Sequence, residues 1–374
     1  MNRFFTKSLV TLSLALIGSE AVASEEISNA PFLGGRDYAV AVSRPNNLLV
    51  VDLKEEKVVR NCQLNGEAAP IGIVLSADNT IGYVITDYAE SINGYDLQSC
   101  KQVFHASVST AQTQGKSLSA LAVSMDNKQV YVVANQTAIK QDRYEVKDPL
   151  FMVFNTADGL DAKAVKTYKA PRQVTVMSTA DDGSIFVAGS QIYKVDPNVG
   201  DFKVVKKIIG WNKKGYSNPD SAATYPIGQT TRELTVMYTA YKFKDKTENY
   251  DTAELFWGLT RIDLKTGKIT QDEFNPYETL MFTSMTNPKD SNMLYGVLTD
   301  LSKFDLKKKK LIKRVDVDHT YYTVGMASDG KKLYLGSTLN DIAVYDTETL
   351  DKLGNIKLPA GDMGTASFHV FYRP

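Results

Sequence analysis

The residues best suited to metal binding or nucleophilic chemistry are few in this chain of 374 residues. His105, His319 and His369 are its three histidines, and Cys62 and Cys100 are its two cysteines. A catalytic zinc site takes three protein ligands beside an open position. Two histidines that met from neighbouring segments would still lack a third ligand, so we expect no metal on this chain.

Motifs that carry known chemistry give no catalytic site either. None of GxSxG, HExxH, GxGxxG, GxxxxGKS or GxxxxGKT occurs in the setting that its chemistry requires. The chain also lacks CxxCH, so it cannot itself carry a covalently attached c-type haem. We therefore expect no catalytic and no cofactor-binding residue on this chain.

A repeated phrase indicates which elements position these side chains. An apolar run ending in Asp or Asn recurs seven times, at Asp52, Asp96, Asn155, Asp196, Asp263, Asp305 and Asp346. The intervals are 44, 59, 41, 67, 42 and 41 residues. A period of about 40–45 residues made of short strands is typical of a β-propeller with one four-stranded blade per repeat. Asp and Asn end strands because their side chains bond the backbone two residues on.

The sequence thus predicts an all-β fold, a seven-bladed β-propeller of four-stranded antiparallel blades. The last repeat supplies strands A to D at 322–328, 332–336, 342–345 and 352–358. The first repeat supplies only strands B, C and D, at 37–43, 47–52 and 57–64. We expect 367–372 to become strand A of blade 1, which would close the ring without an open sheet edge. His105 then lies on an outer strand, His369 on the closing strand and His319 at the entrance to blade 7.

Two repeats are longer than the others, and both excesses fall between strands B and C, at 137–148 and 242–254. B–C and D–A loops emerge on one face of a propeller, so both insertions should lie on that face and flank blade 4. Long loops rich in aromatic residues are uncommon unless they are used. The candidates for a partner-facing surface on this face are Trp211, Trp257, His319, Tyr321 and Tyr322. The alternative is that such aromatic residues only pack the loops.

The repeat frame argues against a disulfide between the two cysteines, although export to an oxidising compartment would favour one. Cys100 falls in the C–D turn of blade 2, whereas Cys62 lies six residues further along the equivalent part of blade 1. At about 3.3 Å per residue, this predicts roughly 20 Å of offset along the axis. A disulfide needs Cα atoms within about 7 Å. The frame therefore favours two unpaired cysteines over a Cys62–Cys100 disulfide.

The N-terminus has the pattern of a signal peptide at 1–23. Arg3 and Lys7 precede an apolar stretch at 8–18 that is too short to span a bilayer, and a small-residue cleavage pattern ends at Ala23. We expect export to the periplasm, with 24–374 forming a single propeller domain; a retained anchor is the alternative. Removing Arg3, Lys7 and Glu20 from 43 basic and 43 acidic residues leaves 41 and 42. This balance gives no case for binding nucleic acid or an anionic membrane.

Three stretches resemble the β subunit of the bacterial quinohemoprotein amine dehydrogenases, a YVTN-type seven-bladed β-propeller. They are GRDYAVAVSRPNNLLVVDL at 35–53, KAPRQVTVM at 169–177 and HTYYTVGMASDGKKLYLGSTLNDIAVYDTETLDKLGNIKLP at 319–359. The matching register runs through nearly the whole mature chain. Many propellers share the strand-turn frame, which is therefore weak evidence for one family. Two motifs are more specific for this family: HTYY, and RDY followed by RP and LLVVD.

The resemblance implies a periplasmic αβγ heterotrimer. In this family the α subunit carries two c-type haems, the small γ subunit carries a cysteine tryptophylquinone, and the β propeller packs against both. Primary amines are oxidised to aldehyde and ammonia, and electrons leave through the haems. We expect this chain to be the non-catalytic subunit that supports the other two.

Two alternatives fit the same residues. One is a free-standing periplasmic propeller that binds a protein or envelope partner and has no redox role. The other is a propeller hydrolase of the lactonase type, which would need acidic, histidine or metal-binding residues meeting at the central channel.

Overall fold

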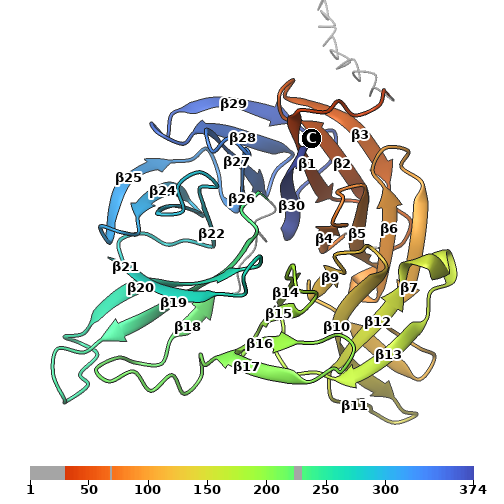
Figure 1. Cartoon of the computed structure of the whole chain (residues 1–374), viewed down its shortest axis with the longest axis horizontal. Coiled ribbons are helices and arrows are strands. Elements are labelled where there is room, and N and C mark those ends of the chain that lie inside the picture. The colour runs from red at the N-terminus through yellow and green to blue at the C-terminus, as the bar shows by residue number, and fades with distance from the viewer. Residues whose placement is uncertain (1–29, 68–69, 223–229) are drawn as a thin grey trace, which may run out of the picture.

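Seven small antiparallel sheets stand in a ring (Figure 1). The structure is a computed structural model that describes residues 30–67, 70–222 and 230–374, and the expected signal peptide at 1–23 lies outside them. Among the described residues, no helix is long and apolar enough to cross a membrane. The predicted all-β, seven-bladed propeller is confirmed.

Each blade has four strands, A to D, from the centre of the ring to its rim. Blades 1 to 3 consist of β30 (Met363–Arg373), β1 (Arg36–Ser43), β2 (Asn47–Asp52) and β3 (Lys57–Gln63); β4 (Gly72–Leu75), β5 (Ile81–Thr86), β6 (Ser91–Asp96) and β7 (Gln102–Ser107); β9 (Leu121–Val123), β10 (Gln129–Ile139), β12 (Leu150–Asn155) and β13 (Ala164–Lys169). Blades 4 and 5 consist of β14 (Val176–Thr179), β15 (Ile185–Ala188), β16 (Ile192–Val195) and β17 (Phe202–Lys206); β18 (Asp220–Ala222), β19 (Glu233–Lys242), β20 (Glu254–Asp263) and β21 (Ile269–Pro276). Blades 6 and 7 consist of β22 (Thr283–Thr286), β23 (Met293–Val297), β24 (Asp300–Asp305) and β25 (Lys310–Asp316); β26 (Tyr321–Met326), β27 (Lys332–Ser337), β28 (Asp341–Asp346) and β29 (Lys352–Lys357).

The aspartates that end strand C form the turns predicted for them. Asp52 Oδ1 accepts hydrogen bonds from the backbone N–H groups of Lys54 and Glu55, at 3.0 and 3.2 Å. The equivalent turns are made by Asp96, Asp196, Asp263, Asp305 and Asp346. Asn155 differs, because the short 3-10 helix η2 (Thr156–Asp161) follows it and its side chain caps no backbone group. These aspartates are therefore structural, which leaves function to other residues.

The C-terminal segment closes the ring, as predicted. β30 pairs antiparallel with β1 from Arg36↔Arg373 to Ser43↔Met363, so it is strand A of blade 1 and longer than the expected 367–372. Blade 7 is also joined to blade 1, because the backbone N–H and the Oγ of Ser328 donate to Asp37 Oδ2 at 3.0 and 3.1 Å. Burial raises the pKa of Asp37.

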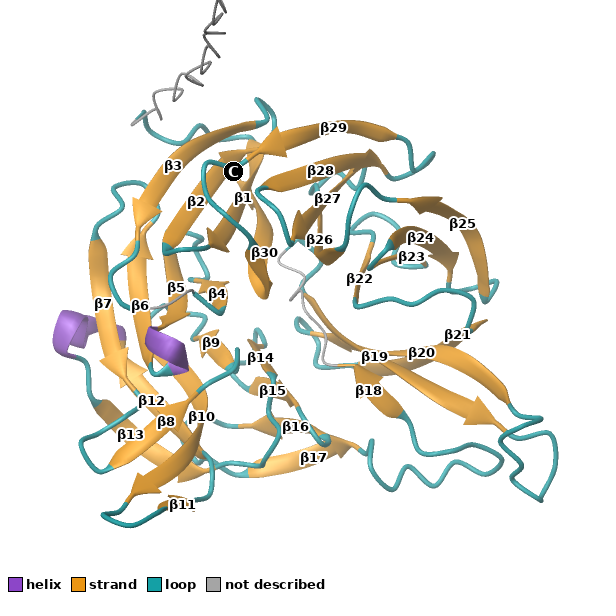
Figure 2. Ribbon diagram, turned by 180° about the vertical axis from the view of Figure 1, so that it is seen from behind, coloured by secondary structure: helices purple, strands orange, loops and turns teal. Residues whose placement is uncertain are grey.

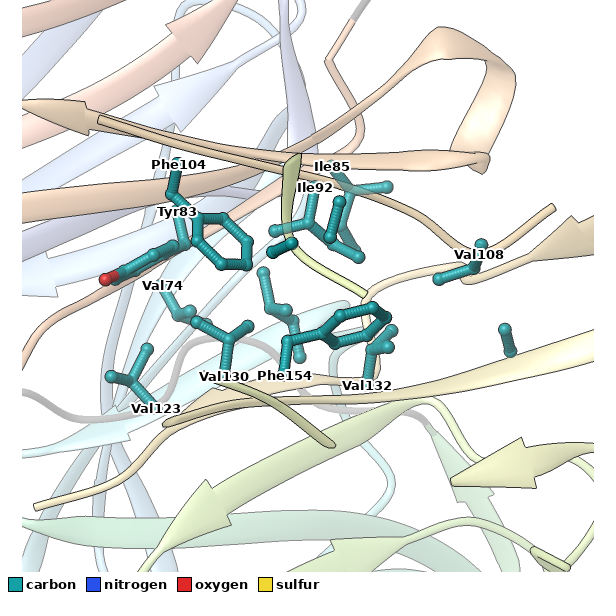
Figure 3. Close-up of a cluster of buried hydrophobic side chains, with 14 of the residues drawn as sticks. Val74, Tyr83, Ile85, Ile92, Phe104, Val108, Val123, Val130, Val132 and Phe154 are labelled. Carbon is teal, nitrogen blue, oxygen red and sulfur yellow. The ribbon is translucent and has the colours of Figure 1, made fainter. Parts of the chain in front are cut away.

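Neighbouring blades are held together by apolar side chains that fill the space between them. Between blades 2 and 3, for example, Tyr83 and Phe104 pack with Val130 and Phe154 (Figure 3). Burying a side chain of this size stabilises a fold by about 1.5–3 kcal/mol. Similar clusters lie between other blades, so the ring provides a rigid base for the loops on its two faces.

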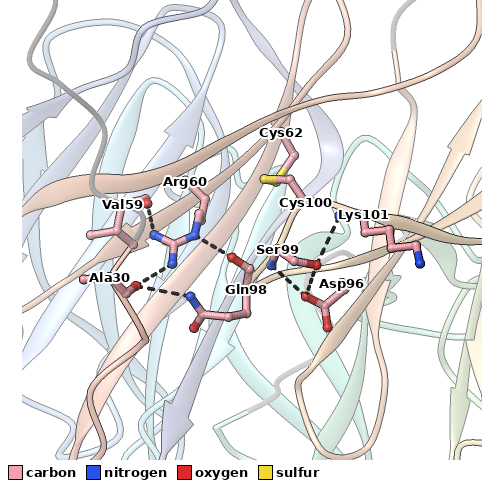
Figure 4. Close-up of a disulfide and its surroundings, with 9 residues drawn as sticks. All are labelled: Ala30, Val59, Arg60, Cys62, Asp96, Gln98, Ser99, Cys100 and Lys101. Carbon is pink, nitrogen blue, oxygen red and sulfur yellow. Dashed lines mark hydrogen bonds between the residues drawn. A yellow bond between two sulfur atoms is a disulfide. The ribbon is translucent and has the colours of Figure 1, made fainter.

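The prediction of two unpaired cysteines is wrong, because Cys62 and Cys100 form a disulfide with their Cα atoms 5.1 Å apart (Figure 4). The prediction assumed that strands of neighbouring blades run side by side along the axis. Each strand is instead rotated by about 20–25° from the one before it. The outermost strand β3 consequently runs along the rim toward blade 2 (Figure 1). There Arg60 Nε donates to the carbonyl oxygen of Gln98 at 2.7 Å, which holds β3 against the C–D turn of blade 2.

Candidate functional site

The two insertions lie on the face formed by the D–A connections, which we call the loop face. In blade 3, β8 (Thr113–Lys116) belongs to the incoming connection and pairs with the extended end of β10. In blade 5, Tyr216 of the incoming connection forms a bridge with Lys242 at the end of β19. Figure 2 shows the two extended hairpins on either side of blade 4. The predicted placement of the insertions is confirmed.

The hairpin of β19 and β20 extends beyond the body of blade 5, and its face toward blade 4 is covered. Trp211 packs edge to face on Tyr238 with ring centroids 5.7 Å apart, and Tyr216 packs on Phe256 at 5.6 Å. Lys213 Nζ lies 3.9 Å from the ring centroid of Tyr216. Burial of the Tyr238 hydroxyl among these rings raises its pKa.

The polar groups of this cover bind one another. Glu273 on β21 forms an ion pair with Lys213 and accepts a hydrogen bond from the Tyr216 hydroxyl at 3.2 Å. The connection from blade 4 is thereby fixed to blade 5 by aromatic packing, a cation over aromatic rings and a shared carboxylate. Trp211 is half-buried by these contacts. They agree with the alternative to a partner-facing role, namely that this aromatic residue packs its own loop.

The opposite face of the same hairpin, toward blade 6, is buried at Trp257 and borders a cavity. Trp257 is 2% exposed, stacks on Tyr277 at 5.3 Å and donates its Nε1–H to the carbonyl oxygen of Thr279 at 2.8 Å. Tyr250 from the insertion packs on Tyr241 at 5.1 Å. These side chains line a cavity of about 660 Å³ together with Leu280 and Phe282. We call it the aromatic groove.

Large apolar side chains remain exposed along the aromatic groove. Tyr250 is 57% exposed, Leu280 51%, Tyr277 37% and Phe282 36%. Tyr322 of blade 7 lies against Phe282 with ring centroids 5.1 Å apart, so the groove reaches toward the entrance of blade 7. Asn218 and Asp220 supply polar groups along its wall. The arrangement is a concave apolar surface with a polar margin, suited to binding rather than to covalent chemistry.

At the entrance of blade 7, the histidine belongs to a closed polar network. His319 Nε2 is 2.9 Å from Asp341 Oδ1, and the Tyr321 hydroxyl donates to Asp341 Oδ2 at 3.2 Å. His319 Nδ1 is 3.2 Å from the Thr338 hydroxyl. Asp341 is buried. The burial of Tyr321 and the nearby Asp341 carboxylate raise the pKa of the Tyr321 hydroxyl. Both carboxylate oxygens are bound within the blade, so this network joins the D–A connection to the B–C turn.

Two of the five partner-facing candidates are corrected by these positions. Trp257 is 2% and Tyr321 0% exposed, so neither presents its side chain to a partner; each packs between its own blade and blade 6. His319 and Tyr322 are half-buried at the loop face and stay predictions, as does Trp211.

Four residues exposed along the groove were not among the sequence-based candidates: Tyr250, Tyr277, Leu280 and Phe282. Tyr250 lies inside the blade 5 insertion. Tyr277, Leu280 and Phe282 follow β21 in one short connection that also contains Met281. The density of large apolar residues in a D–A connection was the signal that could have found them.

The remaining histidines lie on different blades; His105 is bonded within blade 2, and His369 of blade 1 is bonded to blade 2. His105 Nδ1, on β7, is 2.8 Å from Asn93 Oδ1, and His369 Nε2, on β30, is 2.6 Å from the carbonyl oxygen of Ile73. Within the described part of the chain, no group of three or more His, Cys, Asp or Glu residues is placed to hold a metal ion.

Comparisons with known proteins identify the fold. No protein-family model and no curated protein matches the sequence. Among solved structures, the dihydro-haem d1 dehydrogenase NirN aligns with a TM-score of 0.57 and 13% identity over 92% of this chain and 77% of that chain. Hydrazine synthase of Kuenenia stuttgartiensis aligns with a TM-score of 0.54 and 15% identity over 82% of this chain and 90% of that chain. AztD of Citrobacter koseri aligns with a TM-score of 0.52 and 11% identity over 89% of this chain and 97% of that chain. At such identities the likeness shows the fold alone, a seven-bladed propeller.

Proposed function

We propose that this chain is the non-catalytic propeller subunit of a periplasmic quinohemoprotein amine dehydrogenase. The observation that carries the proposal is the aromatic groove, with Tyr250, Leu280, Tyr277 and Phe282 exposed side by side. Contiguous exposed apolar surface of this kind marks interaction sites. A subunit that docks partners, rather than one that performs chemistry, accounts for such a surface.

The sequence resemblance converges on the same face of the ring. Ala170 to Gln173 of the KAPRQVTVM stretch lie in the connection from β13 to β14, and His319 and Thr320 of HTYY lie in the connection from β25 to β26. Both are D–A connections, like the segment that carries Leu280. Part of each of these two stretches therefore lies on the loop face with the groove, which supports the choice of partners.

In the proposed complex, this chain binds and orients its partners. The quinone of the γ subunit and the two haems of the α subunit would supply the redox chemistry. The chain's own polar residues on this face, such as Asp341 and Glu273, are bonded within their blades and hold the loops in shape. NirN, a dehydrogenase, shares the propeller fold, which is consistent with such a scaffold working in a redox enzyme.

Purification of the tagged full chain from cells that also express its neighbouring genes tests the proposal. We expect it to elute with a haem-bearing chain and a small quinone-bearing chain, and the eluate to reduce an artificial acceptor when a primary amine is added. Elution as a colourless monomer, or with a haem-free partner alone, would contradict the amine dehydrogenase assignment.

A matched pair of variants tests the groove itself. Leu280→Asp places a charge at the centre of the exposed wall, and Leu353→Asp makes the same change on the outer strand β29, where Leu353 is also 51% exposed. Because both are surface substitutions, stability should change by only about 0.5 kcal/mol. Leu280→Asp should weaken partner binding by about tenfold or more, since a buried unpaired charge is costly at an interface core. Equal binding by the two variants would remove the groove from the interface.

A further inference from the structure

The insertion in blade 3 ends in a free strand edge. β11 (Tyr144–Val146) pairs with the extended end of β10 through Ile139↔Tyr144, Ala138↔Glu145 and Thr137↔Val146. β10 is paired on its other side with β8, so β11 is the outermost strand of this small sheet. It projects on the opposite side of blade 4 from the β19–β20 hairpin (Figure 2).

The register shows where the backbone groups of β11 point. Opposed residues in an antiparallel pair alternate between hydrogen-bonded and non-hydrogen-bonded positions. The N–H of Lys140 donates to the carbonyl oxygen of Arg143, and the N–H of Lys147 donates to that of Gln136. Tyr144 and Val146 therefore occupy non-hydrogen-bonded positions, and their N–H and C=O groups point away from β10 at the free edge.

The two faces of β11 differ in the same way as those of an amphipathic strand. Tyr144 and Val146 share one face with Ile139 and are 73% and 72% exposed. The other face carries Glu145, which forms ion pairs with Arg143 at 2.6 Å and with Lys147 at 2.8 Å. Glu145, Arg143 and Lys147 pair with one another on their own face of β11. None of these side chains therefore covers the apolar face with Tyr144 and Val146 or the free edge.

An exposed edge with an apolar face is a template for pairing with another strand, which soluble proteins avoid unless the edge is covered. We propose that the free edge of β11 accepts an extended segment of a partner chain, with apolar side chains toward Tyr144 and Val146 and polar ones toward Glu145. Recognition would be by strand addition, in which main-chain hydrogen bonds supply affinity and alternate side chains supply specificity.

The inference rests on the proposed function for its partner, a subunit already held on the loop face. The insertion that carries β11 lies on the loop face as well, so for a docked subunit that spans blade 4, strand addition becomes an intramolecular step that needs little affinity of its own. Pairing with a second copy of this chain is the weaker choice, because a three-residue strand alone buries far less than the roughly 1,200 Å² of a stable interface.

Amide hydrogen exchange of the isolated chain and of the complex tests the inference. The N–H groups of Tyr144 and Val146 should exchange rapidly in the isolated chain and about tenfold or more slowly in the complex, because local opening must precede exchange of a paired amide. Unchanged rates in a complex that contains the haem-bearing chain would overturn the inference and leave the proposed function standing. Slow exchange in an isolated dimer would overturn it in favour of a second copy.

The variant Val146→Pro provides the matched chemical test. Proline removes only the outward N–H of Val146, which β10 does not use, and edge strands tolerate proline. Val146→Ala keeps that N–H and trims the side chain. We expect Val146→Pro to weaken the complex by about tenfold and Val146→Ala by less, since hydrogen bonds at a strand edge carry the affinity. Equal effects would overturn strand addition. Protection in a complex with a haem-free partner would support it while contradicting the proposed function, and a monomer with fast exchange would contradict both.

Discussion

The two faces of the β19–β20 hairpin differ in what covers them, although they belong to the same strands. Toward blade 4, Tyr238 and Phe256 lie beneath Trp211 and Tyr216, and Glu273 binds both Lys213 and the Tyr216 hydroxyl. Toward blade 6, the aromatic groove leaves comparable side chains exposed. The difference comes from the two connections: the one from blade 4 covers the hairpin with Trp211 and Tyr216, whereas the one to blade 6 covers Trp257 but leaves its own Leu280 and Phe282 exposed. One apolar face is completed by the chain itself, and the other is the face on which we propose that a partner docks.

Truncating a phenylalanine on each face should separate stability from binding. Phe256→Ala removes a ring that is 6% exposed and packed on Tyr216, so we expect a loss of about 3–5 kcal/mol in the free energy of unfolding. Phe282→Ala removes a ring that is 36% exposed, and its cost should be at most about 1 kcal/mol. Urea unfolding of the two variants measures both. Equal losses would mean that the two faces do not differ as described.

In binding to the partner subunits, the order of the two variants should reverse. Phe282→Ala should weaken the complex by about tenfold, because aromatic anchors in a groove dominate interface energy. Phe256→Ala, measured at a temperature where it is folded, should bind as the unmodified chain does. If Phe256→Ala weakened binding more than Phe282→Ala, the partner would have to contact the covered face.

A smaller effect is expected from Gly258→Ala, which tests how tightly the covered face is packed. A Cβ at Gly258 would lie 2.0 Å from the ring of Tyr238, which is itself enclosed by Trp211 and Phe256. The ring would have to shift, at a cost of about 1–3 kcal/mol in the free energy of unfolding. The cost should shrink in a Tyr238→Leu background, because the clashing atoms are then absent. An undiminished cost there would place the strain in the backbone instead.

The sequence predicted those features that follow from a local pattern or from the number of strands in the repeats. The turn at Asp52 is a local hydrogen-bonding pattern, and strand A of blade 1 followed from counting strands, since the ring has to close. The disulfide between Cys62 and Cys100 was missed because it depends on strand twist accumulated across a blade. The burial of Trp257 was missed because placing a residue on the loop face does not fix which way its side chain points.

Lys213→Met should give the smallest change in the free energy of unfolding. It tests how much the charge of Lys213 contributes to holding the connection from blade 4 against blade 5. Lys213 lies over the rings of Trp211 and Tyr216 and pairs with Glu273, but its side chain is 37% exposed. Cation–π contacts at exposed sites stabilise by about 0.5–1 kcal/mol, and exposed ion pairs by a similar amount or less. We expect a loss of about 1 kcal/mol at low salt that shrinks as ionic strength rises, since salt screens the pair with Glu273. Partner binding should be unchanged, because the contacts of Lys213 lie on the face toward blade 4, which the chain covers itself. A salt-independent loss would mean that methionine disturbs the aromatic packing and that the charge itself contributes little.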